Sequence, residues 1–145
     1  PHSPRGPHVL AATAHASADA DTAGGVLLLA QMSSSGNLLE DSYTDKTLEM
    51  GTASPHVVGY IGNGSNPSEL GILRSKVGEG KMIWTPGVNL SSKEGVLGQR
   101  YGNPSEAVRA GSDAIIVGSG IHGATEPMTA AREYASASWV ALLER

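Results

Sequence analysis

Four short apolar runs, each followed by a glycine-rich or polar loop, constrain the fold of this chain most strongly. They are residues 25–32, 56–61, 81–85 and 113–117. Each run is continuous rather than alternating, which is the pattern of a strand buried on both faces. Segments with helix signals separate the runs, and strands that alternate with helices form parallel sheets. The sequence therefore predicts an α/β fold whose four parallel strands form either a small open sheet or half of an eight-stranded barrel.

The clearest helix signals are in the last third of the chain. Asn103, Pro104 and Glu106 combine an N-cap, a first-turn proline and an acidic residue three positions after the cap. Gly111 is a suitable end for that helix. A final helix is predicted from about Pro127 to the terminus. Its apolar residues at helical spacing are Met128, Ala131, Ala135, Trp139 and Leu142.

Weaker signals precede these helices. Thr44 is a candidate cap for a helix over 45–53, whereas 62–80 resembles a long mobile loop with room for one helical turn near 69–73. Residues 1–24 are rich in Pro, Ala and Ser and offer little apolar area. We expect them to be a flexible lead-in or insertion, disordered or forming a loose helical turn. Residues 25–145 then form the ordered domain.

Composition narrows the function classes. The chain has 145 residues, enough for one domain, and no cysteine, so disulfides and thiolate metal sites are excluded. Its net charge of −4 gives no general reason to bind nucleic acid. No apolar run approaches the roughly 20 residues that span a bilayer. The five histidines show no metal-ligand spacing. Without a signal-type apolar segment, we expect a cytoplasmic protein that does not bind membranes.

Ligands of parallel sheets bind at the carboxyl ends of the strands. The Gly118-Ser119-Gly120 turn is the best phosphate candidate there, because small residues let backbone N–H groups approach an anion and Ser119 adds a hydroxyl donor. A turn that needs glycine for its dihedral angles is the alternative. The predicted strand ends are 31–36, 62–66, 85–101 and 118–123.

Other polar residues at these ends have two interpretations. Residues 97–101 offer an amide, a cation and a phenol, but a solvated loop explains them equally well. The serines at 33–35 could donate to a ligand's carbonyl groups or could simply end a strand. His122 is the one histidine near the predicted ligand face. No serine lies in a Gly-x-Ser-x-Gly turn, so a hydrolase nucleophile is unsupported.

The strand-end loops become specific when they are considered together. The distinctive segments are 27–38, 43–44, 57–61, 85–90, 97–101 and 111–121, followed by a helix that reaches Trp139. In order and spacing, over roughly residues 25–145, they resemble fungal orotidine 5'-monophosphate decarboxylases. The resemblance implies a parallel half-barrel corresponding to strands five to eight of a (β/α)₈ barrel. It also implies conversion of orotidine monophosphate into uridine monophosphate (UMP) and CO₂, without a metal or organic cofactor.

The same resemblance implies roles for individual residues. Ser33 would hydrogen-bond the pyrimidine, and Pro86 would pack near the base. Gln99 would bridge towards pyrimidine and phosphate, while Tyr101 would bind phosphate. Gly118 and Gly120 would bring their backbone to the phosphate, together with the intervening Ser119.

Three departures from the family pattern stand out. The family's Asp-x-Lys-x-x-Asp array, which supplies the electrostatic stress and the proton for decarboxylation, occurs nowhere in this chain. No catalytic residue is therefore expected here. Ser119 replaces an arginine that grips the phosphate, and Arg100 is positioned to compensate in part. Gln31 stands where the family usually has glutamate.

Half a barrel also leaves an inward face and two strand edges unpaired. We therefore expect a fragment or cleavage product of a full enzyme, inactive without a partner, which is either the missing N-terminal half or a second copy of the chain. Two alternatives remain open: a non-catalytic module that binds nucleotide or phosphate, and a repurposed half-barrel whose activity is unrelated to pyrimidines.

Overall fold

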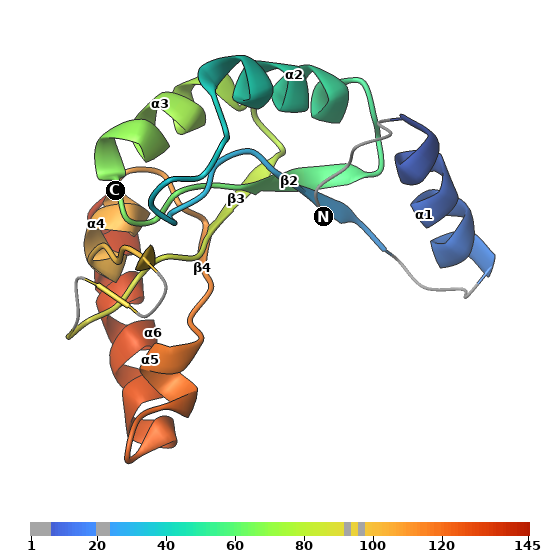
Figure 1. The fold of residues 1–145 in the computed structure, drawn as a ribbon. Helices are drawn as coiled ribbons and strands as arrows, with labels where there is room; N and C mark the ends of the chain where they lie inside the picture. Colours follow the sequence, from blue (N-terminus) through green and yellow to red (C-terminus); the bar gives the residue numbers. More distant parts are fainter. Residues whose placement is uncertain (1–6, 20–23, 92–93, 96–97) are drawn as a thin grey trace.

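The computed structural model describes residues 7–19, 24–91, 94–95 and 98–145. Predictions for residues 1–6, 20–23 and Leu97 lie outside these ranges. The described elements follow one another in the order α1 (Pro7–Asp19), β1 (Val26–Leu29), α2 (Asp41–Thr52), β2 (Val57–Ile61), α3 (Pro67–Lys76), β3 (Met82–Thr85), α4 (Pro104–Arg109), β4 (Ala114–Ile115), α5 (Ser119–His122) and α6 (Pro127–Leu143) (Figure 1).

The four strands form one parallel sheet in the order β1-β2-β3-β4. Tyr60 marks its centre, because it pairs with Leu28 of β1 and Ile83 of β3. The predicted α/β fold with four parallel strands in chain order is confirmed. Strand β4 is shorter than the predicted 113–117, since only Ala114 and Ile115 pair with β3. All four strands end at the same edge of the sheet, which is the edge where the sequence places the candidate site.

Helices cover one face of this sheet. Figure 1 shows α2 and α3 on one side of the strands, with α4, α5 and α6 grouped beside the β4 end. On the covered face Leu28, Tyr60 and Ile83 are at most 2% exposed. On the other face Met82 is 42% exposed, and Trp84 is only half-buried. Parallel sheets are normally covered on both faces, so the second face of this one is incomplete in the isolated chain.

The predicted loop over 62–80 is wrong, because α3 occupies most of it. Asn66 caps this helix, and its Oδ1 accepts a hydrogen bond from the Glu69 amide at 3.3 Å. The same four-residue sequence, Asn-Pro-Ser-Glu, begins α4, where Asn103 Oδ1 accepts from the Ser105 amide at 2.9 Å. The pattern that correctly predicts α4 was therefore also present at the start of α3.

The predicted cap of α2 is also wrong. The helix begins at Asp41 with Glu40 at the N-cap position, so Thr44 lies inside its first turn. Thr44 Oγ1 instead donates to the Ala30 carbonyl at 2.9 Å. This bond ties α2 to the carboxyl end of β1.

The lead-in contains more structure than expected. Residues 7–19 form the helix α1 rather than a loose turn. Leu10 is 3% exposed and belongs to the apolar core. The small apolar area of the segment is therefore sufficient to dock it, because one leucine points into the core. The division of the chain at residue 24 stays a prediction.

Helix α6 is confirmed, but its apolar stripe does not face the core. Tyr134 and Ala141 are buried, at 4% and 0% exposure. Met128, Trp139 and Leu142 of the predicted apolar face are 67%, 61% and 38% exposed. Helix α6 packs on α4, where Ser105 Oγ donates to the Ala137 carbonyl at 3.1 Å, while these three stripe residues stay exposed. Helical spacing identifies residues that share a face, but it does not say which face meets a neighbour.

No described helix is long and apolar enough to cross a membrane.

Candidate functional site

Loops from distant parts of the chain meet at the carboxyl end of the sheet. The segment after β1 lies beside the segment that precedes α4: Ser34 forms an isolated antiparallel bridge with Gln99. Next to this bridge, Arg100 Nε donates to the Ser33 carbonyl at 3.1 Å. Two of the predicted site segments are thus joined by direct hydrogen bonds.

Ser33 is held close to the end of β3. Its side chain is 5% exposed. Gly87 approaches it so closely that an added Cβ would lie 2.5 Å from the Ser33 Cβ, and the φ of Gly87 is +76°. Pro86 precedes this turn, and its carbonyl accepts from the Gly64 amide at 3.1 Å. The predicted pyrimidine contacts, Ser33 and Pro86, therefore lie together, with the end of β2 beside them.

The predicted phosphate contacts also lie together. The Tyr101 hydroxyl is 3.4 Å from Ser119 Oγ, so the 98–102 segment reaches the turn after β4. Gly118 caps the short helix α5, and its carbonyl accepts from the amides of Ile121 and His122. Within the described part of the chain, the amides of Ser119 and Gly120 have no backbone acceptor. This corner thus combines two hydroxyl groups with two available N–H donors, a set suited to an anion.

Two residues of the predicted site, Gln99 and His122, are exposed. Gln99 is exposed, and its interactions with described residues are made by its backbone in the bridge to Ser34 and in a bond to the Gly95 amide. His122 is exposed at the end of α5. Gln99 therefore lies in the site segment, but its side chain makes no hydrogen bond to any residue that the structure describes.

A polar network at the end of β2 was not predicted. Asn63 is 1% exposed, and its Nδ2 donates to Glu69 Oε2 at 3.0 Å. Gln31 Oε1 accepts from the Asn63 amide at 3.0 Å, while Gln31 Nε2 donates to the Glu69 carbonyl at 3.1 Å. A carboxylate at position 31 could not make the second bond, because it has no donor. The sequence signal was a polar residue directly after an apolar strand, which a loop explains equally well.

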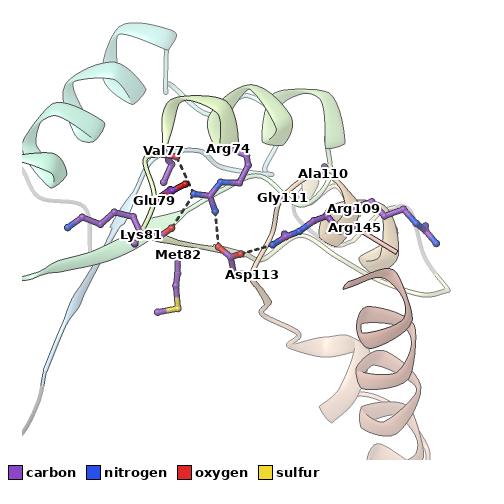
Figure 2. Close-up of a pocket in the computed structure, with 11 residues that line it drawn as sticks. Arg74, Val77, Glu79, Lys81, Met82, Arg109, Ala110, Gly111, Asp113 and Arg145 are labelled. Atoms are coloured by element: carbon purple, nitrogen blue, oxygen red, sulfur yellow. Dashed lines mark hydrogen bonds and ion pairs between the residues drawn. The ribbon is translucent and has the colours of Figure 1, made fainter. Parts of the chain in front are cut away.

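A cavity of about 700 Å³ lies at the amino ends of the strands, opposite the candidate site. Figure 2 shows Asp113 between Arg74 and Arg145, with ion pairs at 2.9 and 3.1 Å. Asp113 Oδ2 also accepts from the Ile83 amide at 2.8 Å. This carboxylate joins α3, β3, the start of β4 and the end of the described chain.

The cations around this cavity are already engaged. Arg74 Nη2 donates to the carbonyls of Val77 and Lys81 in addition to its ion pair. Lys81 Nζ donates to two backbone carbonyls, and Arg109 pairs with Glu144 at 2.6 Å. This cavity is therefore lined by groups that satisfy one another, which is the arrangement of a structural network. In the described ranges, no cluster of three or more His, Asp or Glu side chains could hold a metal ion.

Comparison with known sequences gives one consistent result. The family model described as "Orotidine 5'-phosphate decarboxylase / HUMPS family" matches residues 4–134. The orotidine 5'-phosphate decarboxylase of Penicillium nalgiovense is 38% identical over 122 residues, and that of Passalora fulva is 36% identical over 122 residues. Each match covers 83% of this chain but 44% of the relative. The chain thus spans less than half the length of these relatives.

Solved structures agree with the sequence comparison. Orotidine 5'-phosphate decarboxylase from Pyrococcus horikoshii OT3 superposes with a TM-score of 0.65 at 29% identity, over 79% of this chain and 51% of that one. Orotidine 5'-monophosphate decarboxylase from Sulfolobus solfataricus gives a TM-score of 0.62 at 26% identity, over 86% of this chain and 52% of that one. The four-stranded sheet therefore corresponds to about half of each of these folds.

Proposed function

Because the chain belongs to the orotidine 5'-phosphate decarboxylase / HUMPS family, we propose that it supplies the pyrimidine- and phosphate-binding half of an enzyme that converts orotidine monophosphate into UMP and CO₂. One observation carries this proposal. The loops after β1, β3 and β4 meet at one edge of the sheet, where Ser33, Tyr101 and Ser119 lie with Pro86 and the amides of the 118–120 turn.

The phosphate is assigned to the corner formed by Tyr101 and the turn. Two hydroxyl groups and the amides of Ser119 and Gly120 supply donors to its oxygens, and Gly118 keeps the approach open. Ser119 gives one neutral hydrogen bond where a family arginine would give a bidentate charged contact. Arg100 could compensate only in part, since its Nε is bonded to the Ser33 carbonyl and only its other N–H groups remain for a phosphate. Phosphate binding by this chain alone is therefore weak.

The pyrimidine is assigned to the neighbouring pair of loops. Ser33 would hydrogen-bond the base, Pro86 would pack against it, and Gln99 would reach between base and phosphate. The Gln99 backbone holds the segment in place, and its side chain makes no hydrogen bond to a described residue. The bond from Arg100 to the Ser33 carbonyl keeps the serine and glutamine segments at a fixed separation.

Decarboxylation requires a partner. The Asp-x-Lys-x-x-Asp array expected to drive the reaction is missing from this sequence, so the partner must provide it. The uncovered sheet face, with Met82 and Trp84, is the surface that such a partner would close. The missing N-terminal half fits this role better than a second copy, because a second copy would also lack the array. No metal or organic cofactor enters the proposal, and we place the protein in the cytoplasm, with which the lack of cysteine agrees.

Orotidine monophosphate turnover tests the catalytic part. The chain is mixed with the N-terminal portion of the Penicillium nalgiovense enzyme, and decarboxylation is followed alongside each part alone. Activity in the mixture, and none in either part, is expected. If the mixture forms a complex by size-exclusion chromatography but does not turn over, the catalytic proposal fails.

A non-catalytic binding module is the second candidate, and the absence of the Asp-x-Lys-x-x-Asp array from a chain that keeps the binding loops favours it. Calorimetry of the chain with UMP and with uridine distinguishes two hypotheses, the decarboxylase half and the binding module, from a third, a repurposed half-barrel. Weak, salt-sensitive binding of UMP without complemented turnover would support the module. Equal or absent binding of the two ligands would indicate a function unrelated to pyrimidine nucleotides.

A further inference from the structure

Tyr134, on the last helix, contacts two of the loops at the carboxyl end of the sheet. Its side chain is 4% exposed. Its hydroxyl oxygen accepts a hydrogen bond from the Leu90 amide at 3.0 Å, which fixes the loop after β3. A residue far along the chain thus holds a loop that leads into the candidate site.

The same hydroxyl lies directly against the phosphate turn. A Cβ added to Gly120 would lie 2.2 Å from the Tyr134 hydroxyl oxygen and 2.9 Å from its Cζ. Gly120 is not among the glycines with positive φ. The need for glycine at position 120 therefore comes from the close approach of Tyr134, and not from a backbone conformation that only glycine adopts.

From these contacts we infer that Tyr134 is a positioning residue for the phosphate subsite. It fixes the separation between the loop at Leu90 and the turn at Gly120, and so keeps the amides of Ser119 and Gly120 directed at one point. This inference rests on the proposed function, since it concerns the group that the turn would bind: the phosphate of a nucleoside monophosphate. Hydrogen-bond donors bind a phosphate well only when they lie within a fraction of an ångström of the right positions. A displaced turn would therefore bind the phosphate less well.

A second tyrosine provides a matched control. Tyr60 is 1% exposed, and its hydroxyl donates to the Leu48 carbonyl at 3.2 Å. Each tyrosine thus has a buried hydroxyl that is hydrogen-bonded to the backbone, with Tyr60 as donor and Tyr134 as acceptor, and Tyr60 also bonds the Thr52 side chain. Tyr60 makes it on the helix-covered face, where it contacts no site loop, whereas Tyr134 makes it beside the turn. Removing either hydroxyl costs the fold at least one buried hydrogen bond, but only the removal at Tyr134 should alter phosphate recognition.

The test compares Tyr134→Phe and Tyr60→Phe in the full chain. Affinities for UMP and uridine are measured by calorimetry at low salt, and the readout is the ratio of the uridine Kd to the UMP Kd. Tyr134→Phe is expected to lower this ratio about 3- to 10-fold, the size of one hydrogen bond. Uridine affinity should stay the same, and Tyr60→Phe should leave the ratio unchanged.

A second measurement needs no ligand. Hydrogen exchange at the hydrogen-bonded amides of Leu90, Ile121 and His122 should speed up about 10-fold in Tyr134→Phe but not in Tyr60→Phe, because the Leu90 amide loses its acceptor and the turn loses the hydroxyl packed against it. Unchanged exchange overturns the inference whatever the chain binds. A wild-type chain that prefers UMP, together with a Tyr134→Phe ratio equal to wild type, overturns the inference and leaves the proposed function standing. A wild-type chain that binds UMP no better than uridine overturns the proposed function itself.

Discussion

The two ends of the parallel strands use their polar groups in opposite ways. At the amino end, Asp113 is shared by Arg74, Arg145 and a backbone amide, and the neighbouring cations also have protein acceptors (Figure 2). At the carboxyl end, Tyr101 and Ser119 share one long contact of 3.4 Å, and the amides beside them have no backbone acceptor among the described residues. The amino end, with more charge and a cavity of about 700 Å³, is therefore the end with less hydrogen-bonding capacity left for a ligand.

This difference indicates that the amino end of the sheet stabilises the fold, whereas the carboxyl end binds the ligand. In barrels of parallel strands, ligands bind at the carboxyl end, while residues at the amino end serve the stability of the fold. Hydrogen-bonding capacity that the protein does not itself satisfy is therefore a better guide to a site than volume or charge. The comparison makes distinct predictions for substitutions at the two ends.

The largest effect is expected at the amino end. Asp113→Ala should lower the free energy of unfolding by about 2–4 kcal/mol, because it leaves two arginines and a buried amide without their shared acceptor. Urea denaturation measures the change. Glu144→Ala is the control: it breaks an ion pair whose side chains are 49% and 51% exposed, and it should cost less than about 1 kcal/mol. A change in the UMP-to-uridine preference of Asp113→Ala at a temperature where it is folded would break the comparison.

The next effect belongs to the carboxyl end. Tyr101→Phe removes a hydroxyl from the phosphate corner and should weaken UMP binding by about 10- to 100-fold, as expected for a hydrogen bond to a charged group. Uridine binding and the midpoint of urea denaturation should hardly change. Loss of stability without loss of UMP preference would assign Tyr101 to structure and contradict the contrast between the ends.

A gain of function sharpens the same point. Ser119→Arg restores the charged group that the family resemblance implies, and should tighten UMP binding by about 5- to 20-fold with a steeper dependence on salt. Ser119→Gln is the matched control, since it adds length without charge and should not tighten binding. Equal affinity of the arginine and glutamine variants would show that the phosphate does not lie at this turn.

The smallest expected effect is on the pH dependence of stability, and it concerns the helix-covered face of the sheet between its two ends. Burial raises the pKa of the Tyr60 hydroxyl above its ordinary value. The neutral phenol is therefore favoured in the folded chain, so its contribution to stability is present below the ordinary tyrosine pKa of about 10 and is lost as pH rises through the folded value. Unfolding free energies at about pH 9 and pH 11 should differ more in wild type than in Tyr60→Phe. Equal differences would show that Tyr60 ionises freely in the fold.

The order and direction of the strands could be predicted from the sequence, because continuous apolar runs indicate strands buried on both faces, and helix signals between them indicate a parallel sheet. It also contained the signal for α3, since Asn66 begins the same four-residue pattern as Asn103. That signal was outweighed by the Gly, Ser and Asn around it. For α6, periodicity predicted the helix but not its buried side, which depends on where α4 lies.

The site was predictable only in part, for a related reason. Ser33, Tyr101 and the 118–120 turn follow apolar runs, and parallel strands bring such positions to one edge. The contact between Tyr134 and Gly120, and the network around Asn63, depend on tertiary approach between segments with no shared pattern. The same holds for Asp113 and its two arginines. Residues that position a site from a distance leave little trace in sequence spacing.

Titration of the isotopically labelled chain with UMP, followed by amide chemical shifts in NMR spectra, tests the central claim most directly. The account predicts that the largest shifts fall on Ser33, Tyr101 and residues 118–120, and that the amides around Arg74, Arg109 and Arg145 do not move. Shifts confined to the arginine-lined cavity, or no shifts at millimolar UMP, would contradict it.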